Sequence, residues 1–200
     1  MDEVHWVDRL DPMNHCVHWP QGLVGCLDTY PCTIATPSDP VAAKLYYQGK
    51  YDSAVFKIQI IIDLTGRIVW FSMPHLGVTS DPKIWRHTRP HFNAGEFVLA
   101  DGAYISCAHC LCPYKAQQGQ PLAAGEDEVN SLIQLYRARV EHVIGLVENC
   151  ELFRSKSRMG IELAMSCARV FVHATALHLN ETNKLIRRYP NTMLHGPRPH

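Results

Sequence analysis

The stretch Gly95-Glu-Phe-Val-Leu-Ala-Asp-Gly-Ala-Tyr104 decides the fold of this chain. Its apolar run from Phe97 to Ala100 is typical of a strand that is buried on both faces, and Gly102 predicts a turn directly after it. Asp101 is therefore expected at the carboxyl end of a buried strand. A carboxylate in that position needs a partner, so Asp101 is a candidate functional side chain.

Two other acids stand in similarly constrained places. Asp28 lies inside an apolar strand predicted at about Leu23 to Ile34, and Glu141 lies on a helix predicted from Glu126 to Glu148. Glu141 is one step round this helix from its apolar stripe, so its carboxylate can reach past the core edge toward the sheet. We therefore expect the rest of the chain to be the frame that brings the three acids together.

Length and composition limit the classes of protein to which the chain can belong. It has 200 residues, of which 46% are hydrophobic, and this indicates one domain with a real core. It has no apolar run of roughly 18 residues and no basic-then-apolar signal peptide, so we expect an intracellular chain without a membrane segment. The 19 basic and 19 acidic residues cancel, so bulk charge argues neither for nor against a polyanionic partner.

The other elements follow from periodicity and turn residues. Alternating apolar residues on both sides of Asp63-Leu-Thr-Gly66 predict a hairpin, and Ser80-Asp-Pro82 predicts the capped start of a helix. In chain order we expect a leader that packs on the domain (1–22), a strand (23–34), a polar, tyrosine-rich connection (44–52), a hairpin (54–62 and 67–73), a short helix to about His87, the strand before Asp101, a flexible loop with Gly119, Pro121 and Gly125, two helices (126–148 and 161–179) and a loose tail (181–200).

Side-chain spacing predicts which faces are buried, and Pro31 suggests that the first strand has an edge or a bulge near its end. The expected core faces are Val24, Cys26, Asp28, Tyr30 and Cys32 on the first strand; Phe56, Ile58, Ile60 and Ile62 in the hairpin; Val129, Leu132, Ile133, Tyr136, Val140, Val143, Ile144 and Val147 on the long helix; and Leu163, Cys167, Val170, Phe171 and Leu177 on the last helix.

The order of these elements resembles the ribonuclease-H-like fold, an α/β architecture in which a mixed sheet is flanked by helices. Asp28 and Asp101 are 73 positions apart (101 − 28), and Asp101 and Glu141 are 40 apart (141 − 101). This wide-then-narrow spacing resembles that of the DDE nucleases and transposases. We expect residues 23–180 to form such an endonuclease domain.

Seven blocks make the resemblance more specific, because they occur in the order found in Harbinger-type transposase nuclease domains. They are Val24-Gly-Cys-Leu-Asp28, Tyr46-Tyr-Gln-Gly-Lys50, Asp63-Leu-Thr-Gly-Arg-Ile68, Gly77-Val-Thr-Ser-Asp81, Leu99-Ala-Asp-Gly-Ala-Tyr104, Cys112-Pro-Tyr-Lys115 and Arg139-Val-Glu-His-Val-Ile-Gly145. The resemblance covers about Leu23 to Asn180. It implies that Asp28, Asp101 and Glu141 are the catalytic acids and metal ligands.

The chemistry of phosphodiester cleavage explains why acids are wanted. Two Mg²⁺ ions held by carboxylates activate a water and stabilise the leaving oxyanion, and hard oxygen ligands select Mg²⁺ or Mn²⁺ over zinc. In this interpretation Asp28 bridges the two ions, and Asp101 and Glu141 each complete the shell of one. Hydrolysis of DNA and, later, strand transfer by a DNA 3′ hydroxyl would follow.

The resemblance also implies partners and a location. It implies DNA as the substrate, a separate Myb-like protein that supplies sequence recognition, and a nuclear location; assembly into homo-oligomers stays open. Because the formal net charge is zero and no recognition helix is evident, we expect weak DNA binding without sequence preference.

Several alternatives remain at this point. The chain has Asp28-Thr-Tyr where the family has Asp-Gly-Thr, which leaves less room beside the metals and favours a second hypothesis, a catalytically inactive DNA-binding or protein-interaction module. Glu148 is the fallback third ligand. Asp81 is ambiguous between a ligand and a helix cap, and the cap is preferred.

The eight cysteines allow a further alternative. A zinc site would use Cys107, His109, Cys110 and Cys112, but the sequence has no second pair at comparable spacing. Reduced, structural cysteines are therefore preferred, because a free cysteine behaves as a small buried hydrophobic residue.

Overall fold

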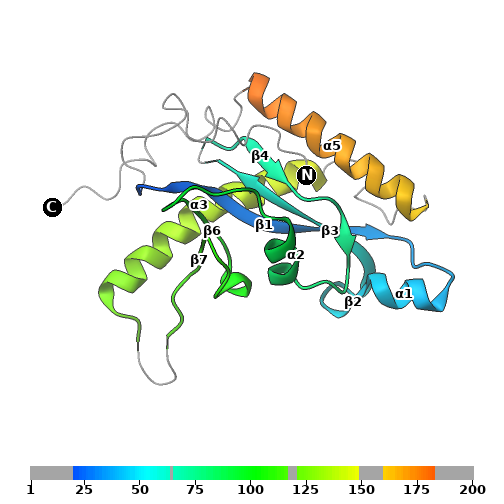
Figure 1. Cartoon of the computed structure of the whole chain (residues 1–200), viewed down its shortest axis with the longest axis horizontal. Helices are drawn as coiled ribbons and strands as arrows, with labels where there is room; N and C mark the ends of the chain where they lie inside the picture. The colour runs from blue at the N-terminus through cyan, green and yellow to red at the C-terminus, as the bar shows by residue number, and fades with distance from the viewer. Residues whose placement is uncertain (1–19, 64, 117–120, 149–159, 183–200) are drawn as a thin grey trace.

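The computed structural model describes residues 20–63, 65–116, 121–148 and 160–182, and Figure 1 shows their arrangement. The expected leader, the loose tail and the loop position Gly119 lie outside the described residues, except for a few residues at their margins. The described part is an α/β fold with one mixed seven-stranded sheet, flanked by helices in the manner of the ribonuclease-H-like fold. The predicted fold class is thus confirmed.

Strand β1 (Leu23–Ile34) lies at the centre of the sheet, with the bounds that the sequence predicts. It pairs antiparallel with β3 (Ser53–Ile62) on one side and parallel with β6 (Phe97–Leu99) on the other. The β6 pairing spans only Leu23 to Cys26, so among the described strands the later half of β1, which contains Pro31, has a partner on one side only. This half is the local edge that the proline suggests.

The predicted hairpin is confirmed as β3 and β4 (Ile68–Phe71), which are joined by a turn around Asp63. The Asp63 carboxylate accepts hydrogen bonds from the backbone of Thr65 and Arg67 and from Arg67 Nε at 2.7 Å. The outer side of β3 is shared by three short strands in sequence, β2 (Tyr47–Gln48), β5 (His75–Leu76) and β4. The last strand, β7 (Cys110–Leu111), pairs with β6.

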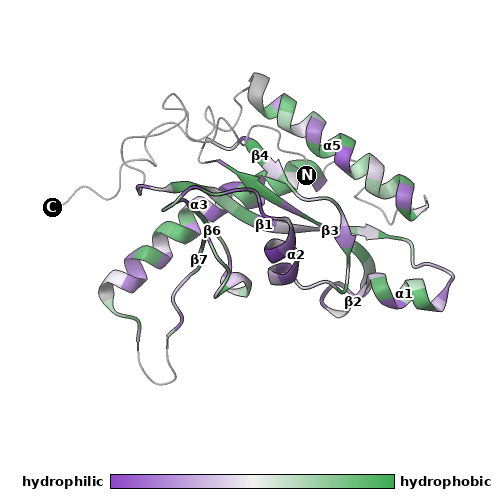
Figure 2. Cartoon of the chain, viewed as in Figure 1, coloured by the Kyte–Doolittle hydropathy of each residue, from purple (hydrophilic) through white to green (hydrophobic). Residues whose placement is uncertain are grey.

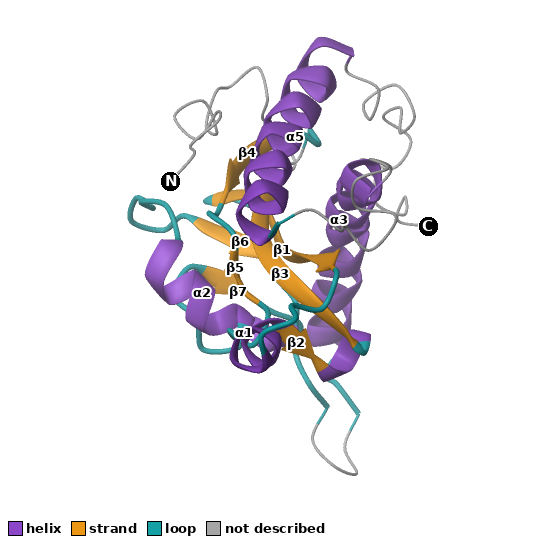
Figure 3. Ribbon diagram, turned by 90° about the vertical axis from the view of Figure 1, so that its right-hand side faces the viewer, coloured by secondary structure: helices purple, strands orange, loops and turns teal. Residues whose placement is uncertain are grey.

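Helices cover both faces of the sheet, and each face has its own core. Figure 3 shows α2 (Asp81–Thr88) and α3 (Ala124–Glu148) on opposite sides of the strands. The first core lies under α3 and α5 (Ile161–Thr182), and the second contains Trp85 of α2, which meets Trp70 edge-to-face at 6.0 Å. Because both faces are covered, the central strands are apolar almost throughout (Figure 2).

The predicted burial of α5 is largely wrong. Leu163, Val170 and Leu177 are 55%, 69% and 57% exposed, Cys167 is half-buried, and Phe171 is the one of the five that packs against the core. The buried face consists instead of Ala164, Ala168, Val172, Ala176 and Leu179. Small alanine side chains let the helix backbone approach the sheet closely, whereas ranking by hydrophobicity favours the larger residues on the outer side.

Two further expectations are corrected near β1 and on α3. Val24 lies in the second core while Cys26 lies in the first, because a register shift between Leu23 and Gly25 breaks the alternation. A Cβ at Gly25 would lie 2.1 Å from the carbonyl oxygen of Ile62, so only glycine fits there. On α3 the predicted stripe is buried at most positions, but Leu132 is 48% exposed.

The connection after β1 is more regular than expected. Residues Pro40–Tyr46 form helix α1, whose N-cap Asp39 accepts a hydrogen bond from Ala42 N and whose first residue is proline. The predicted polar connection therefore begins within a helix and continues through β2 and the 3-10 turn η3 (Gly49–Tyr51). None of the described helices is long and apolar enough to cross a membrane.

Candidate active site

Two of the predicted acids lie side by side at the centre of the sheet. Cys26 of β1 pairs with Leu99 of β6 in a parallel register, and Asp28 and Asp101 each lie two residues beyond that pair. Neighbouring strands are about 4.8 Å apart. The fold therefore places Asp28 and Asp101 at corresponding positions of two neighbouring backbone segments, β1 and the residues that follow β6.

The Asp28 carboxylate lies on the α3 face of β1. Its Oδ1 accepts a hydrogen bond of 2.8 Å from the backbone N–H of Thr29, and its Oδ2 lies 3.7 Å from Nη2 of Arg137. The Asp28 side chain is 22% exposed, so it is mostly removed from water but can still be reached.

Asp101 follows β6 and caps the 3-10 turn η4 (Gly102–Tyr104). Its Oδ1 accepts a hydrogen bond of 2.8 Å from Ala103 N, which fixes the carboxyl group against the backbone. The described residues offer no hydrogen bond or ion pair to the other oxygen of Asp101. One oxygen is therefore held and the other is available to a ligand.

Glu141 projects from the middle of α3 and shares Arg137 with Asp28. Its Oε1 lies 4.0 Å from Arg137 Nη2, one helical turn away, and its side chain is 64% exposed. The same guanidinium nitrogen thus faces the acid of β1 and the acid of α3. Most of the Glu141 side chain is therefore in water, whereas most of the Asp28 side chain is not.

The pKa of Asp28 responds to burial and to the charges around it. Burial raises the pKa of the Asp28 carboxyl above its usual value, whereas the Thr29 N–H and the Arg137 guanidinium lower it. The negative charges of Asp101 and Glu141 raise this pKa further. Burial is therefore the main cause of the raised pKa, and the two neighbouring acids add to it.

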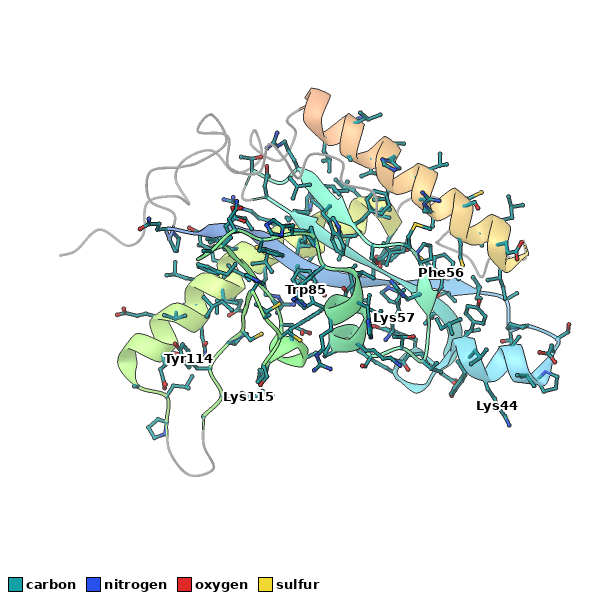
Figure 4. The ribbon with its side chains drawn as sticks, in the orientation of Figure 1. Lys44, Phe56, Lys57, Trp85, Tyr114 and Lys115 are labelled. Carbon is teal, nitrogen blue, oxygen red and sulfur yellow. The ribbon has the colours of Figure 1, made fainter. Side chains whose placement is uncertain are left out.

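The two alternative ligands, Glu148 and Asp81, have other described contacts. The charge of Glu148 acts on Cys32, four residues along β1 from Asp28. Asp81 is bound by Lys57 Nζ at 3.0 Å, and this lysine is only 5% exposed beside α2 (Figure 4). Ser80 is the N-cap residue of α2 but makes no side-chain capping hydrogen bond, so the expected cap is not formed by side chains.

Three polar side chains tie the acid-bearing segments together from the other face of the sheet, and the sequence did not reveal them. The Tyr104 hydroxyl lies 2.6 Å from Thr29 Oγ1 and accepts a hydrogen bond of 2.8 Å from Gln59 Nε2. Gln59 and Tyr104 are buried. The sequence did contain one indication of these contacts, a glutamine within the apolar strand β3, because a buried amide needs hydrogen-bond partners.

The cysteine cluster packs as part of the second core. Cys107 is buried there, Cys110 and Cys112 pack against it, and His109 stacks on Phe92 while its Nδ1 lies 2.9 Å from the Glu96 carbonyl oxygen. Burial first, and then the nearby charge of Asp101, raise the pKa of the Cys112 thiol to about 11.

The donor atoms of the acid site suit a hard divalent cation, but the side chains are not spaced as ligands of one ion. Asp28, Asp101 and Glu141 supply only carboxylate oxygens, which suit Mg²⁺ or Mn²⁺. Within the described ranges, however, no three His, Cys, Asp or Glu side chains are spaced to hold a metal ion.

Comparison with known proteins gives one match. The family model described as DDE superfamily endonuclease matches residues 27–179, a segment that contains all three acids. Searches of curated proteins and of solved structures found no match. Because the matched segment covers most of the chain, and because its acids lie on the strands and helix described above, the chain belongs to the DDE superfamily endonuclease family.

Proposed function

We propose that this chain is a metal-dependent DNA endonuclease whose catalytic acids are Asp28, Asp101 and Glu141. The observation that carries the proposal is the placement of the three acids: Asp28 and Asp101 each lie two residues beyond the paired residues Cys26 and Leu99, and Asp28 and Glu141 lie 3.7 and 4.0 Å from the same nitrogen of Arg137. The family match supports the reaction class. Mutual repulsion among acids is the arrangement expected where divalent cations bind.

The protein contributes positioning, and each acid does so differently. Bound Mg²⁺ or Mn²⁺, two ions in this proposal, supplies a water activated for attack and a positive charge that stabilises the leaving oxyanion. Asp28 is fixed in the central strand by the Thr29 N–H, and Asp101 is fixed by its bond to Ala103. Glu141 can turn in from the exposed side of α3, which lets the site open to a DNA strand.

The finer assignment extends this proposal. Seven sequence blocks in order support a Harbinger-type transposase nuclease, and for that class we propose strand transfer as a second reaction, DNA as substrate, a Myb-like protein for target recognition, self-association and a nuclear location. The zero net charge supports the need for a separate recognition protein, because phosphate neutralisation supplies most non-specific affinity for DNA.

Nicking of supercoiled DNA tests the activity. The purified chain is incubated with plasmid and Mn²⁺ or Mg²⁺, alongside Asp101→Asn, in which the oxygen that caps η4 is kept. Asp127→Asn removes an equal charge from the exposed first turn of α3 and is the matched control. We expect metal-dependent nicking by the wild type and by Asp127→Asn, and none by Asp101→Asn. Binding to DNA without nicking in any metal would instead favour the inactive, DNA-binding or protein-interaction module.

A salt titration of DNA binding tests the partner assignment. We expect the isolated chain to bind random and element-end sequences with similar, weak affinity that falls as salt is added. Tight, sequence-specific binding by this chain alone would rule out the need for a separate recognition protein.

A further inference from the structure

Arg137 places a positive charge where the two candidate ligands from different elements face each other. Its Nη2 lies 3.7 Å from Asp28 Oδ2 and 4.0 Å from Glu141 Oε1, and its side chain is 20% exposed. The guanidinium therefore neutralises part of the negative charge of the site. Arg137 and Glu141 are four residues apart on α3, so the helix itself sets this arrangement.

The contacts of Arg137 are those of a loosely held counter-ion. A strong arginine–carboxylate pair forms two parallel bonds of about 2.8 Å, whereas both distances here are longer than a hydrogen bond. The buried Nε of Arg137 also has no hydrogen-bond partner. The guanidinium thus remains near the acids through charge attraction and can be displaced without breaking a hydrogen-bond network.

We propose that Arg137 is an internal counter-ion that competes with the divalent metal for the acid site. This inference rests on the proposed function. The same two oxygens that face Arg137 would have to turn toward a metal ion, and a divalent ion beside a guanidinium is repelled by it. Binding of the metal therefore requires that Arg137 move away from Asp28 and Glu141.

Metal binding also requires the acid oxygens to move. Mg²⁺ coordinates oxygens at about 2.1 Å, so Asp28 Oδ2 and Glu141 Oε1, which lie 3.7 and 4.0 Å from Arg137 Nη2, must lie closer to a metal ion than they lie to the guanidinium. The exposed side chain of Glu141 can turn to close the shell once Arg137 leaves. Arg137 thus offsets part of the repulsion among the acids when no metal is bound, and it raises the metal concentration at which the site fills.

Calorimetric titration of the full chain with Mn²⁺, and separately with Mg²⁺, tests this competition without relying on catalysis. The variant is Arg137→Gln, which keeps a polar side chain but removes the charge. Arg86→Gln is the matched control, because Arg86 is exposed in the last turn of α2, a helix on the opposite side of the strands from α3, and among the described residues it makes no ion pair with the three acids. We expect Arg137→Gln to bind Mn²⁺ roughly tenfold more tightly than the wild type, and Arg86→Gln to bind as the wild type does.

The outcomes separate this inference from the proposed function. Metal binding by the wild type with equal or weaker binding by Arg137→Gln would overturn the competition alone. Failure of wild type and variant alike to bind metal would overturn both. If Arg137→Gln does not fold, nuclear magnetic resonance of the wild type decides, with the Nε–H resonance of Arg137 assigned by comparison with Arg137→Lys. This resonance should shift as Mg²⁺ saturates the chain. An unchanged resonance would overturn the competition.

Discussion

The phenolic oxygen of Tyr104 lies 2.6 Å from Oγ1 of Thr29. Thr29 directly follows Asp28, and Tyr104 lies three residues after Asp101, so this hydrogen bond links the segments that carry the two acids. Gln59 of β3 joins the same group, because its Nε2 donates to the Tyr104 hydroxyl and to the Asp81 carbonyl oxygen at 2.9 Å. The strand that carries Asp28 and the turn capped by Asp101 are therefore held together by a buried polar network on the opposite face of the sheet.

Tyr104→Phe tests this network. The variant removes a buried hydroxyl and leaves Thr29 Oγ1 without its closest partner, so we expect a loss of about 1–2 kcal/mol in the free energy of unfolding, measured in urea. Tyr114→Phe, at an exposed tyrosine on the segment before α3 (Figure 4), should lie within about 0.5 kcal/mol of the wild type. Equal free energies of unfolding for the two variants would show that the hydrogen bonds of the Tyr104 hydroxyl do not stabilise the fold.

Asp28→Asn should change how stability depends on pH. The folded-state pKa of Asp28 is raised above its unfolded value, so the folded chain holds the proton more tightly and loses this stabilisation as pH rises through the folded pKa. We therefore expect the two proteins to be similar in stability below about pH 4 and the variant to become relatively more stable as pH rises, without metal. Urea unfolding between pH 4 and 8 measures this, and an advantage for the wild type that grows with pH would contradict it.

Asp101→Asn should distinguish the effect of charge repulsion on stability from the effect of metal binding on stability. The amide keeps the oxygen that caps η4 and removes one of the charges acting on Asp28, so the metal-free variant should melt at or above the temperature of the wild type. With Mg²⁺ at about 100 times its dissociation constant the wild type should gain roughly 2.7 kcal/mol. The variant should not respond. A metal response in the variant equal to that of the wild type would exclude Asp101 as a ligand.

Ala168→Leu tests the close packing of α5 on the sheet. Ala168 is fully buried, so a larger side chain should push the helix away and cost about 1–3 kcal/mol in the free energy of unfolding. Leu177→Ala, on the exposed face of the same helix, should change stability by less than about 0.5 kcal/mol. If the second variant were the more damaging one, the buried face of α5 would be the apolar face that the sequence predicts.

The sequence predicted those elements whose residues repeat at a regular interval. The bounds of β1, the hairpin and α3 agree with the structure, because period two and steps of three and four are strong there. α1 was missed although Asp39 and Pro40 form a proper helix start, since the helix buries none of its residues and so has no apolar stripe to detect. Val24 was misplaced because a register shift has no signature in side-chain polarity.

The parts of the site that depend on contacts between distant residues were not predictable in the same way. The positions of the acids followed from a strand end, a strand interior and a helix face, which are local features. The bonds among Tyr104, Thr29 and Gln59 join residues 30 to 75 positions apart, and the contact between Arg137 and Asp28 joins α3 to β1. Only the packing of the whole domain decides such contacts.

The half-paired state of β1 has a consequence for the solubility of the protein. Among the described strands, none pairs with the side of β1 toward β6 beyond Cys26, and an unpaired strand side is a template on which other chains can add strands and aggregate. Pro31 lies within this open half and has no N–H to donate to an incoming strand. The edge next to the acids can therefore stay open to a substrate without becoming a site for strand addition.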